Sequence, residues 1–129
     1  MRVRERDERG AAVPEFVLVL LVLVPLVFGI AQVALVMHVR NTMTAAASDG
    51  ARAAAGLEGS IDDARARARE VLSTTLADRY ADGVTARETR VEGMNVVEVR
   101  VSGAVPPLGL WGPRVEVDAV GRAVRQEAP

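Results

Sequence analysis

The sequence predicts an α+β protein with a long N-terminal transmembrane helix that continues outward, a second amphipathic helix and a three-stranded antiparallel sheet. Three observations lead to this fold class. An uncharged apolar run extends from Phe16 to Met37, apolar and small residues then recur at spacings of three and four, and the C-terminal half alternates with period two. A helix over the apolar run would be about 33 Å long, which matches the ~30 Å hydrocarbon core of a bilayer.

The apolar run divides the chain into four parts. We expect a cytoplasmic leader (1–10), a transmembrane helix (11–38), an alanine-rich helix extension (39–57) and an extracytoplasmic α+β domain (58–129). The basic residues before the apolar run are Arg2, Arg4, Arg6 and Arg9. On its other side, only Arg40 and Arg52 lie close to the helix end. This bias predicts a single-pass protein of the cell membrane with its N-terminus inside and its C-terminal domain outside.

A cleaved secretory signal peptide is the rival interpretation of the N-terminal region. The segment before the apolar run is basic, and Ala45 to Ala47 offers a small-residue cleavage pattern. The run is longer than the 7–15 residues of an ordinary signal-peptide core, which favours the membrane anchor.

Composition and charge bear on the class of function. The net charge of −1 argues against a nucleic-acid partner. The chain has no cysteine, so disulfides, thiolate nucleophiles and thiolate metal sites are excluded. No nucleophile–base pair, ligand cluster or glycine-rich phosphate loop can be recognised, so we expect no enzyme activity, no cofactor, no metal and no small-molecule substrate.

The segment from Asn41 to Ala55 is rich in alanine and favours a helix that continues out of the membrane. Its small residues are Ala45, Ala46, Ala47, Ala51, Ala54 and Ala55. Small side chains allow another helix or a sheet to approach closely. Two interpretations stay open: a helix that packs within its own chain, and a face for assembly with other subunits.

The second helix is predicted from Ser60 onward. Ser60 and Asp63 resemble a capping box, and the acidic residues that follow Ile61 suit the first turn of a helix. Apolar and small residues at spacings of three and four form a stripe along this helix: Ile61, Ala64, Ala68, Val71, Leu72, Leu76 and Tyr80. It predicts one helix that runs to about Tyr80 and ends before Gly83.

Three strands are predicted after Gly83, at 84–91, 95–105 and 114–124. In the second strand Val97, Val99 and Val101 share one face, which we expect to be covered by the helices. The proline-rich stretch 106–113 cannot continue the hydrogen-bond pattern of a β-sheet and is predicted to be a loop. Its apolar residues are Leu108, Leu110 and Trp111. We expect them to fold back over the sheet, because a small core needs its apolar groups; contact with the membrane or with a partner is the alternative.

Two motifs in the N-terminal half point to a known family. The first is Arg9-Gly10-Ala11-Ala12-Val13-Pro14-Glu15-Phe16, directly before the apolar run; the second combines Arg40-Asn41 with Ala45-Ala46-Ala47-Ser48-Asp49-Gly50-Ala51-Arg52. Together they resemble the TadE-like pseudopilins of the tight-adherence pilus system. The resemblance covers residues 9–56, and beyond them only the general pilin-like plan is shared.

The resemblance implies a structural role in pilus assembly. A prepilin peptidase would cut between Gly10 and Ala11, and Glu15, next to Phe16, would pair with the new N-terminal amine of a neighbouring subunit. Arg40, Asn41, Gly50, Ala51 and Arg52 are the residues of the second motif. The implied partners are membrane lipid, the peptidase, other pilin or pseudopilin subunits and the assembly machinery. The alternative is an uncleaved, membrane-anchored extracytoplasmic binding module.

Overall fold

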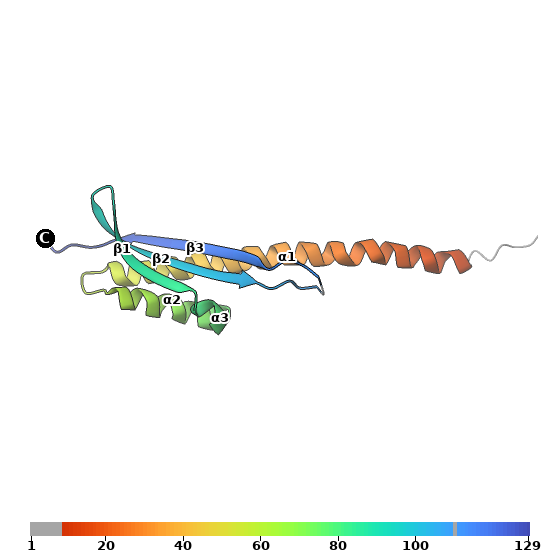
Figure 1. Ribbon diagram of the computed structural model, residues 1–129, viewed down its shortest axis with the longest axis horizontal. Helices are drawn as coiled ribbons and strands as arrows, with labels where there is room; N and C mark the ends of the chain where they lie inside the picture. Colours follow the sequence, from red (N-terminus) through yellow and green to blue (C-terminus); the bar gives the residue numbers. More distant parts are fainter. Residues whose placement is uncertain (1–8, 110) are drawn as a thin grey trace, which may run out of the picture.

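The computed structural model describes residues 9–109 and 111–129 and confirms the predicted fold class. The elements, in chain order, are α1 (Arg9–Ala55), α2 (Ile61–Thr75), α3 (Asp78–Ala81), β1 (Val84–Val91), β2 (Met94–Val105) and β3 (Val115–Val124). Half of α1 projects alone from one end of the molecule, and the other half is packed in the folded domain (Figure 1). The C-terminus lies at the opposite end of the domain from that projecting half (Figure 1).

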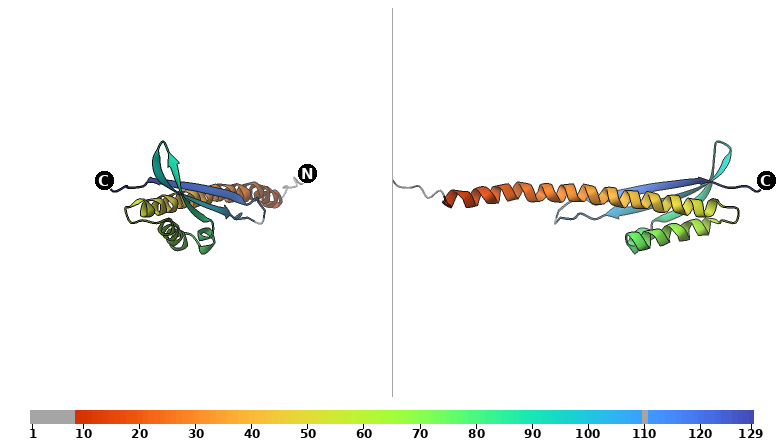
Figure 2. Two further views of the ribbon diagram at one scale, coloured as in Figure 1. Left: turned by 60° about the vertical axis from the view of Figure 1, so that its left-hand side comes forward. Right: turned by 180° about the vertical axis from the view of Figure 1, so that it is seen from behind.

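The sheet has the order β1-β2-β3 with both pairs antiparallel. The turn between β1 and β2 is Glu92-Gly93, which lies between the first two predicted strands, and both residues have positive φ (51° and 83°). The outer half of α1 and the whole of α2 lie side by side on one face of the sheet (Figure 2). The domain is therefore a two-layer sandwich with one covered and one open sheet face.

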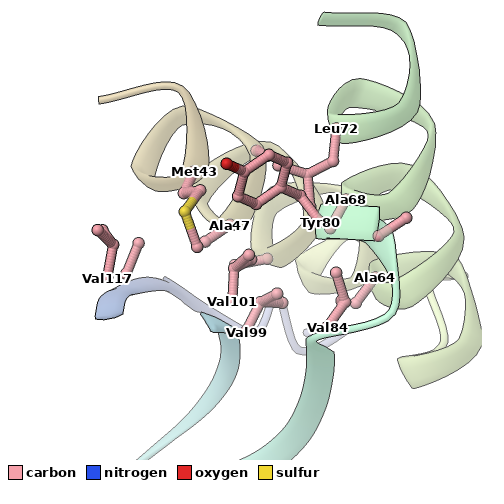
Figure 3. Close-up of a cluster of buried hydrophobic side chains, with 14 of the residues drawn as sticks. Met43, Ala47, Ala64, Ala68, Leu72, Tyr80, Val84, Val99, Val101 and Val117 are labelled. Carbon is pink, nitrogen blue, oxygen red and sulfur yellow. The ribbon is translucent and has the colours of Figure 1, made fainter. Parts of the chain in front are cut away.

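The covered face of the sheet carries the valines that the alternation predicts. Val97, Val99 and Val101 are fully buried under the helices. Figure 3 shows Met43 of α1, Leu72 of α2 and Tyr80 of α3 gathered over Val99 and Val101. The largest fully buried side chains are Met43, Leu72, Val97, Val99, Val101 and Val105. Burying each contributes about 1.5–3 kcal/mol relative to exposure, which holds the layers together without disulfides.

The predicted end of the second helix at Tyr80 is wrong. α2 ends at Thr75, Ala77 is extended (φ −164°, ψ 153°), and the short helix α3 begins at Asp78. The end coincides with Ser73, Thr74 and Thr75, which have low helix propensity. The hydroxyl of Thr74 also donates to the carbonyl oxygens of Glu70 and Val71, a contact that perturbs helices. The break turns Tyr80 back over the sheet, where it is buried.

The C-terminal residues after β3 are tied to the rest of the domain. The backbone N–H of Gln126 donates to the carbonyl of Ala55 at the end of α1 (2.7 Å), and that of Arg125 donates to Asn95 (2.8 Å). The guanidinium of Arg125 also donates to the carbonyl of Gly59 (2.8 Å) and pairs with Glu88. These bonds close the end of the domain that lies farthest from the projecting half of α1.

Candidate functional site

The projecting half of α1 exposes apolar side chains on every side. From Ala12 to Ala31 each residue is exposed, and from Gln32 onward one face of the helix is covered by the domain. One segment of the described chain, Ala12–Ala55, is long and apolar enough to cross a bilayer. This small domain cannot bury a helix that is apolar on every side, so the helix fits a single-pass membrane anchor.

The predicted processing and pairing residues lie near the start of α1. Gly10 is exposed, a Cβ added to it would meet no heavy atom within 4 Å, and Ala11 follows it in the same helix. Glu15 and Phe16 are exposed, and no hydrogen bond or ion pair of Glu15 occurs within the described part of the chain. The rest of the predicted leader, including Arg2, Arg4 and Arg6, lies outside the described residues.

Pro14 is the sixth residue of α1, not a member of its first turn. A proline has no backbone N–H, so it cannot donate to the carbonyl four residues earlier. That carbonyl belongs to Gly10, the residue predicted to precede the cleaved bond. The helix is therefore weakened by one hydrogen bond at the peptide Gly10–Ala11.

The second motif divides into exposed and buried residues. Arg40, Asn41 and Arg52 are exposed, whereas Gly50 and Ala51 are buried. A Cβ on Gly50 would lie 2.6 Å from the carbonyl oxygen of Ala64 in α2. Because real Cβ contacts are not that short, glycine at this position is what lets α1 and α2 approach so closely.

An acidic residue between the buried positions of the motif links the two helices. The carboxylate of Asp49 lies 3.9 Å from Arg52 on α1 and 3.7 Å from Arg67 on α2. All three side chains are more than two-fifths exposed, so these pairs contribute little to stability. They lie beside the Gly50 contact between α1 and α2.

The alanine-rich segment faces the chain's own domain. Five of its six small residues are buried there, namely Ala46, Ala47, Ala51, Ala54 and Ala55, while Ala45 is exposed. On the sheet side, a Cβ on Gly121 of β3 would lie 2.3 Å from the carbonyl carbon of Ala47. The small residues thus serve the packing of α1 between α2 and β3, which is the first of the two interpretations.

The loop between β2 and β3 does not fold back over the sheet, so that prediction is wrong. Trp111 is 93% exposed and Leu108 is 47% exposed, while Leu110, the third residue of that prediction, lies outside the described residues. The covered face of the sheet is already filled by α1, α2 and Tyr80, which leaves no room for the loop. Instead the side chain of Gln32 holds it against α1, donating to Pro106 O (3.2 Å) and accepting from Leu108 N–H (2.9 Å).

The open face of the sheet carries a buried carboxylate that the alternation pattern assigned to solvent. Glu98 is 3% exposed; its Oε1 accepts from Arg87 Nη2 and its Oε2 from Arg122 Nε, both at 2.8 Å. The three residues are direct neighbours in the strand register. Hydrogen bonds from Arg122 and then Arg87 lower the pKa of Glu98 below its ordinary value. Burial raises the pKa, but by less than either hydrogen bond lowers it.

Within residues 9–109 and 111–129, no three histidine, aspartate or glutamate side chains lie close enough together to hold a metal ion. Two exposed apolar surfaces are present in the described chain: the projecting half of α1, with Glu15 near its start, and the β2–β3 loop beside it.

Comparison with known proteins places the resemblance on α1. Residues 10–52 match the family model described as TadE-like protein, and this third of the chain lies entirely within α1. Searches of curated proteins and of solved structures returned no match. The matched segment contains the first motif from Gly10 to Phe16 and the whole second motif from Arg40 to Arg52. The resemblance to TadE-like proteins predicted from the sequence is therefore confirmed over residues 10–52.

Proposed function

We propose that this protein is a minor pseudopilin, a structural and non-enzymatic subunit for assembly of a tight-adherence pilus, processed by a prepilin peptidase. The observation that carries the proposal is the TadE-like match over residues 10–52, which indicates involvement in tight-adherence pilus assembly. The match begins at Gly10, so the predicted cleavage residue is the first residue of the family segment. In this proposal the N-terminus lies on the cytoplasmic side of the membrane and the domain on the outer side, as the arginines before the apolar run predict.

The helix around Pro14 supports processing after Gly10. In the uncut chain Pro14 lies within α1 and costs up to about 3 kcal/mol there, because its ring crowds the Gly10 carbonyl and it donates no hydrogen bond. After cleavage the helix would begin at Ala11, and Pro14 would fall in its first turn. Proline is well tolerated there, so cleavage removes the cost of Pro14, whereas Pro25 stays inside the helix in both forms.

Glu15 supplies the proposed pairing group. Its side chain is exposed on the apolar surface of α1, where an unpaired carboxylate within a bilayer is costly. Cleavage creates a positively charged amine at Ala11. Opposite charges attract far more strongly in a low-dielectric region than in water, so an amine of a neighbouring subunit would fix the register of assembly.

Mass spectrometry of the membrane-extracted protein tests the processing step. Coexpression with the peptidase should give a chain that begins at Ala11, and Gly10→Val should leave the leader in place because a branched side chain obstructs the cleaved bond. Ala12→Val, two residues further on, is the matched control and should still be cut. An uncut wild-type chain in the presence of active peptidase would contradict processing.

A paired substitution tests the pairing role. Glu15→Gln keeps the side-chain shape and removes the charge, and should reduce co-purification with other pilus subunits by about tenfold, equivalent to about 1.4 kcal/mol. Glu58→Gln, at the exposed turn beyond α1, is the control and should leave co-purification unchanged.

The second candidate is an uncleaved, membrane-anchored binding module. The observation in its favour is that Gly50 and Ala51 are buried in the chain's own domain, so part of the family motif is explained by folding alone. This candidate predicts that Glu15→Gln has no effect on co-purification and that the leader stays intact.

A further inference from the structure

The loop between β2 and β3 lies beside the exposed half of α1 rather than beside the sheet. In Figure 1 it extends past the ends of the strands, along α1 toward its N-terminal half. Its position is fixed by the two hydrogen bonds to the Gln32 side chain, one from the amide nitrogen to Pro106 O and one from Leu108 N–H to the amide oxygen. Gln32 is thus the polar point at which the loop is attached to an otherwise apolar helix.

An apolar groove separates this loop from α1. It has a volume of about 690 Å³ and reaches from Gln32 back to Val24, along Phe28 and Gly29. Its wall on the loop side includes Pro107, Leu108, Trp111 and Pro113. Among the described residues, Trp111 is the most exposed large apolar side chain. With the exposed Leu108, Phe28 and Val24 it forms a contiguous apolar patch along the groove, and patches of this kind mark binding sites for apolar partners or membranes.

The position of the groove along α1 indicates which occupant it holds. The stretch exposed on all sides, Ala12 to Ala31, would be about 30 Å long as a helix, which is the thickness of the hydrocarbon core. With this stretch in the bilayer, Gln32 lies at the membrane surface on the domain side. The groove extends from there about 12 Å toward Val24, hence into the leaflet next to the domain.

The composition of the loop suits this position. No charged residue occurs between Val105 and Arg114. Pro106, Pro107 and Pro113 have no N–H, which reduces the backbone donors that would lack water. Tryptophan is enriched where hydrocarbon meets headgroups, and the exposed Arg114 directly after the loop can reach lipid phosphates.

We propose that the β2–β3 loop is a second membrane contact, which places Leu108 and Trp111 in the leaflet next to the domain and holds a phospholipid acyl chain in the groove against Val24 and Phe28. Lipid is favoured over a protein helix because the groove opens onto the same apolar surface of α1 that the bilayer surrounds. The contact fixes the rotation and depth of the domain on the membrane. It requires only that α1 spans the bilayer, and neither cleavage nor pilus assembly.

Trp111 is the only tryptophan of the chain, so its fluorescence reports on the loop directly. The full chain is reconstituted in phosphatidylcholine–phosphatidylglycerol vesicles whose acyl chains carry bromine near the headgroup or near the chain end. Bromine near the headgroup should reduce Trp111 fluorescence about twofold, as expected for a residue at the interface, and bromine at the chain end should reduce it less.

Two control chains carry the tryptophan elsewhere, each in a Trp111→Phe background. Phe28→Trp lies on α1 within the groove and should be quenched, whereas Leu57→Trp lies at the far end of the domain and should not. If Phe28→Trp is quenched and Trp111 is not, the loop is outside the lipid and the proposal is overturned. If Trp111 fluorescence instead shifts only with protein concentration, another chain fills the groove, which also overturns it. Absence of quenching in both places would overturn the membrane anchor itself.

Discussion

At the scale of single residues, Glu98 is the side chain whose environment differs most from its sequence pattern. Alternation along β2 places it on the open sheet face, where a glutamate is ordinarily solvated. It is buried because the strand register sets Arg87 on one side and Arg122 on the other. The alternation of one strand could not reveal this, because the two partners are 11 and 24 residues away along the chain.

We predict that Glu98→Gln lowers the free energy of unfolding by about 1 kcal/mol near neutral pH, since both arginines are more than half exposed and water screens the pairs. The pKa of Glu98 is lowered in the folded state, so its contribution is present above its ordinary pKa of 4.5. It is lost as the pH falls through the lower folded-state pKa. Thermal unfolding of wild type and variant in detergent between pH 7 and 3 should therefore converge.

Glu116→Gln is the matched control for that comparison. Glu116 is exposed on β3 and forms no ion pair within the described chain. Its substitution should leave stability and its pH dependence unchanged. A Glu98→Gln chain that is as stable as Glu116→Gln at pH 7 would show that the arginines do not stabilise the sheet.

Gly50 gives a second prediction at this scale. Gly50→Ala should destabilise the domain by about 1–3 kcal/mol, because the new Cβ would lie 2.6 Å from a backbone carbonyl of α2 that cannot rotate away. Gly29→Ala, in the same helix but with no atom within 4 Å, should not destabilise it. Denaturation of both variants in detergent checks the difference, and equal stability would exclude a close-contact role for Gly50.

At the scale of elements, local signals predicted most of the fold. The capping box starts α2, Glu92-Gly93 turns β1 into β2, and the period-two run forms β2. The sequence does not predict the end of α2, because the apolar stripe continues at helical spacing through Leu76 and Tyr80. Periodicity indicates which residues are buried, and the two helices α2 and α3 can bury the same residues as one long helix.

Ser60 is the clearest element-scale test. Its hydroxyl accepts from the N–H of Asp63 (3.2 Å), while the Asp63 carboxylate accepts from the N–H of Ser60 (2.8 Å). The Ser60 hydroxyl also donates to the Asp63 carboxylate (2.8 Å), and this bond, followed by the one from the Ser60 N–H, lowers the pKa of Asp63. Ser60→Ala should cost about 1 kcal/mol of stability by removing the cap.

Ser73→Ala provides the control for the cap, because Ser73 is an exposed serine near the other end of α2. Alanine should be neutral or slightly favourable there. The two variants are compared by thermal unfolding in the same detergent. A Ser60→Ala chain that unfolds at the temperature of Ser73→Ala would exclude the capping role.

At the scale of the whole molecule, the absence of cysteine makes the proposed orientation directly measurable. Leu57→Cys introduces one thiol at the exposed turn between α1 and α2, at the far end of the domain. A membrane-impermeant maleimide should label it in intact cells. Labelling that appears only after the membrane is permeabilised would place the domain inside, contrary to the proposal.

The sequence could place the loop 106–113 outside a strand but not beside α1. Its prolines prevent sheet hydrogen bonding wherever the loop lies in space. Its attachment to Gln32 joins residues that are 74 and 76 positions apart, a distance over which no local pattern operates. A polar residue within an apolar helix is the one signal that could have suggested a contact there.

The unbroken course of α1 has a mechanical consequence. No loop separates the membrane segment from the domain, and Gly50 and Gly121 bring α2 and β3 into backbone contact with its outer half. A force on the N-terminal end of α1 therefore acts parallel to the close-packed interfaces of α1 with α2 and β3, and these interfaces resist it together. A chain built this way keeps its domain folded around one end of α1 while force acts on the other end.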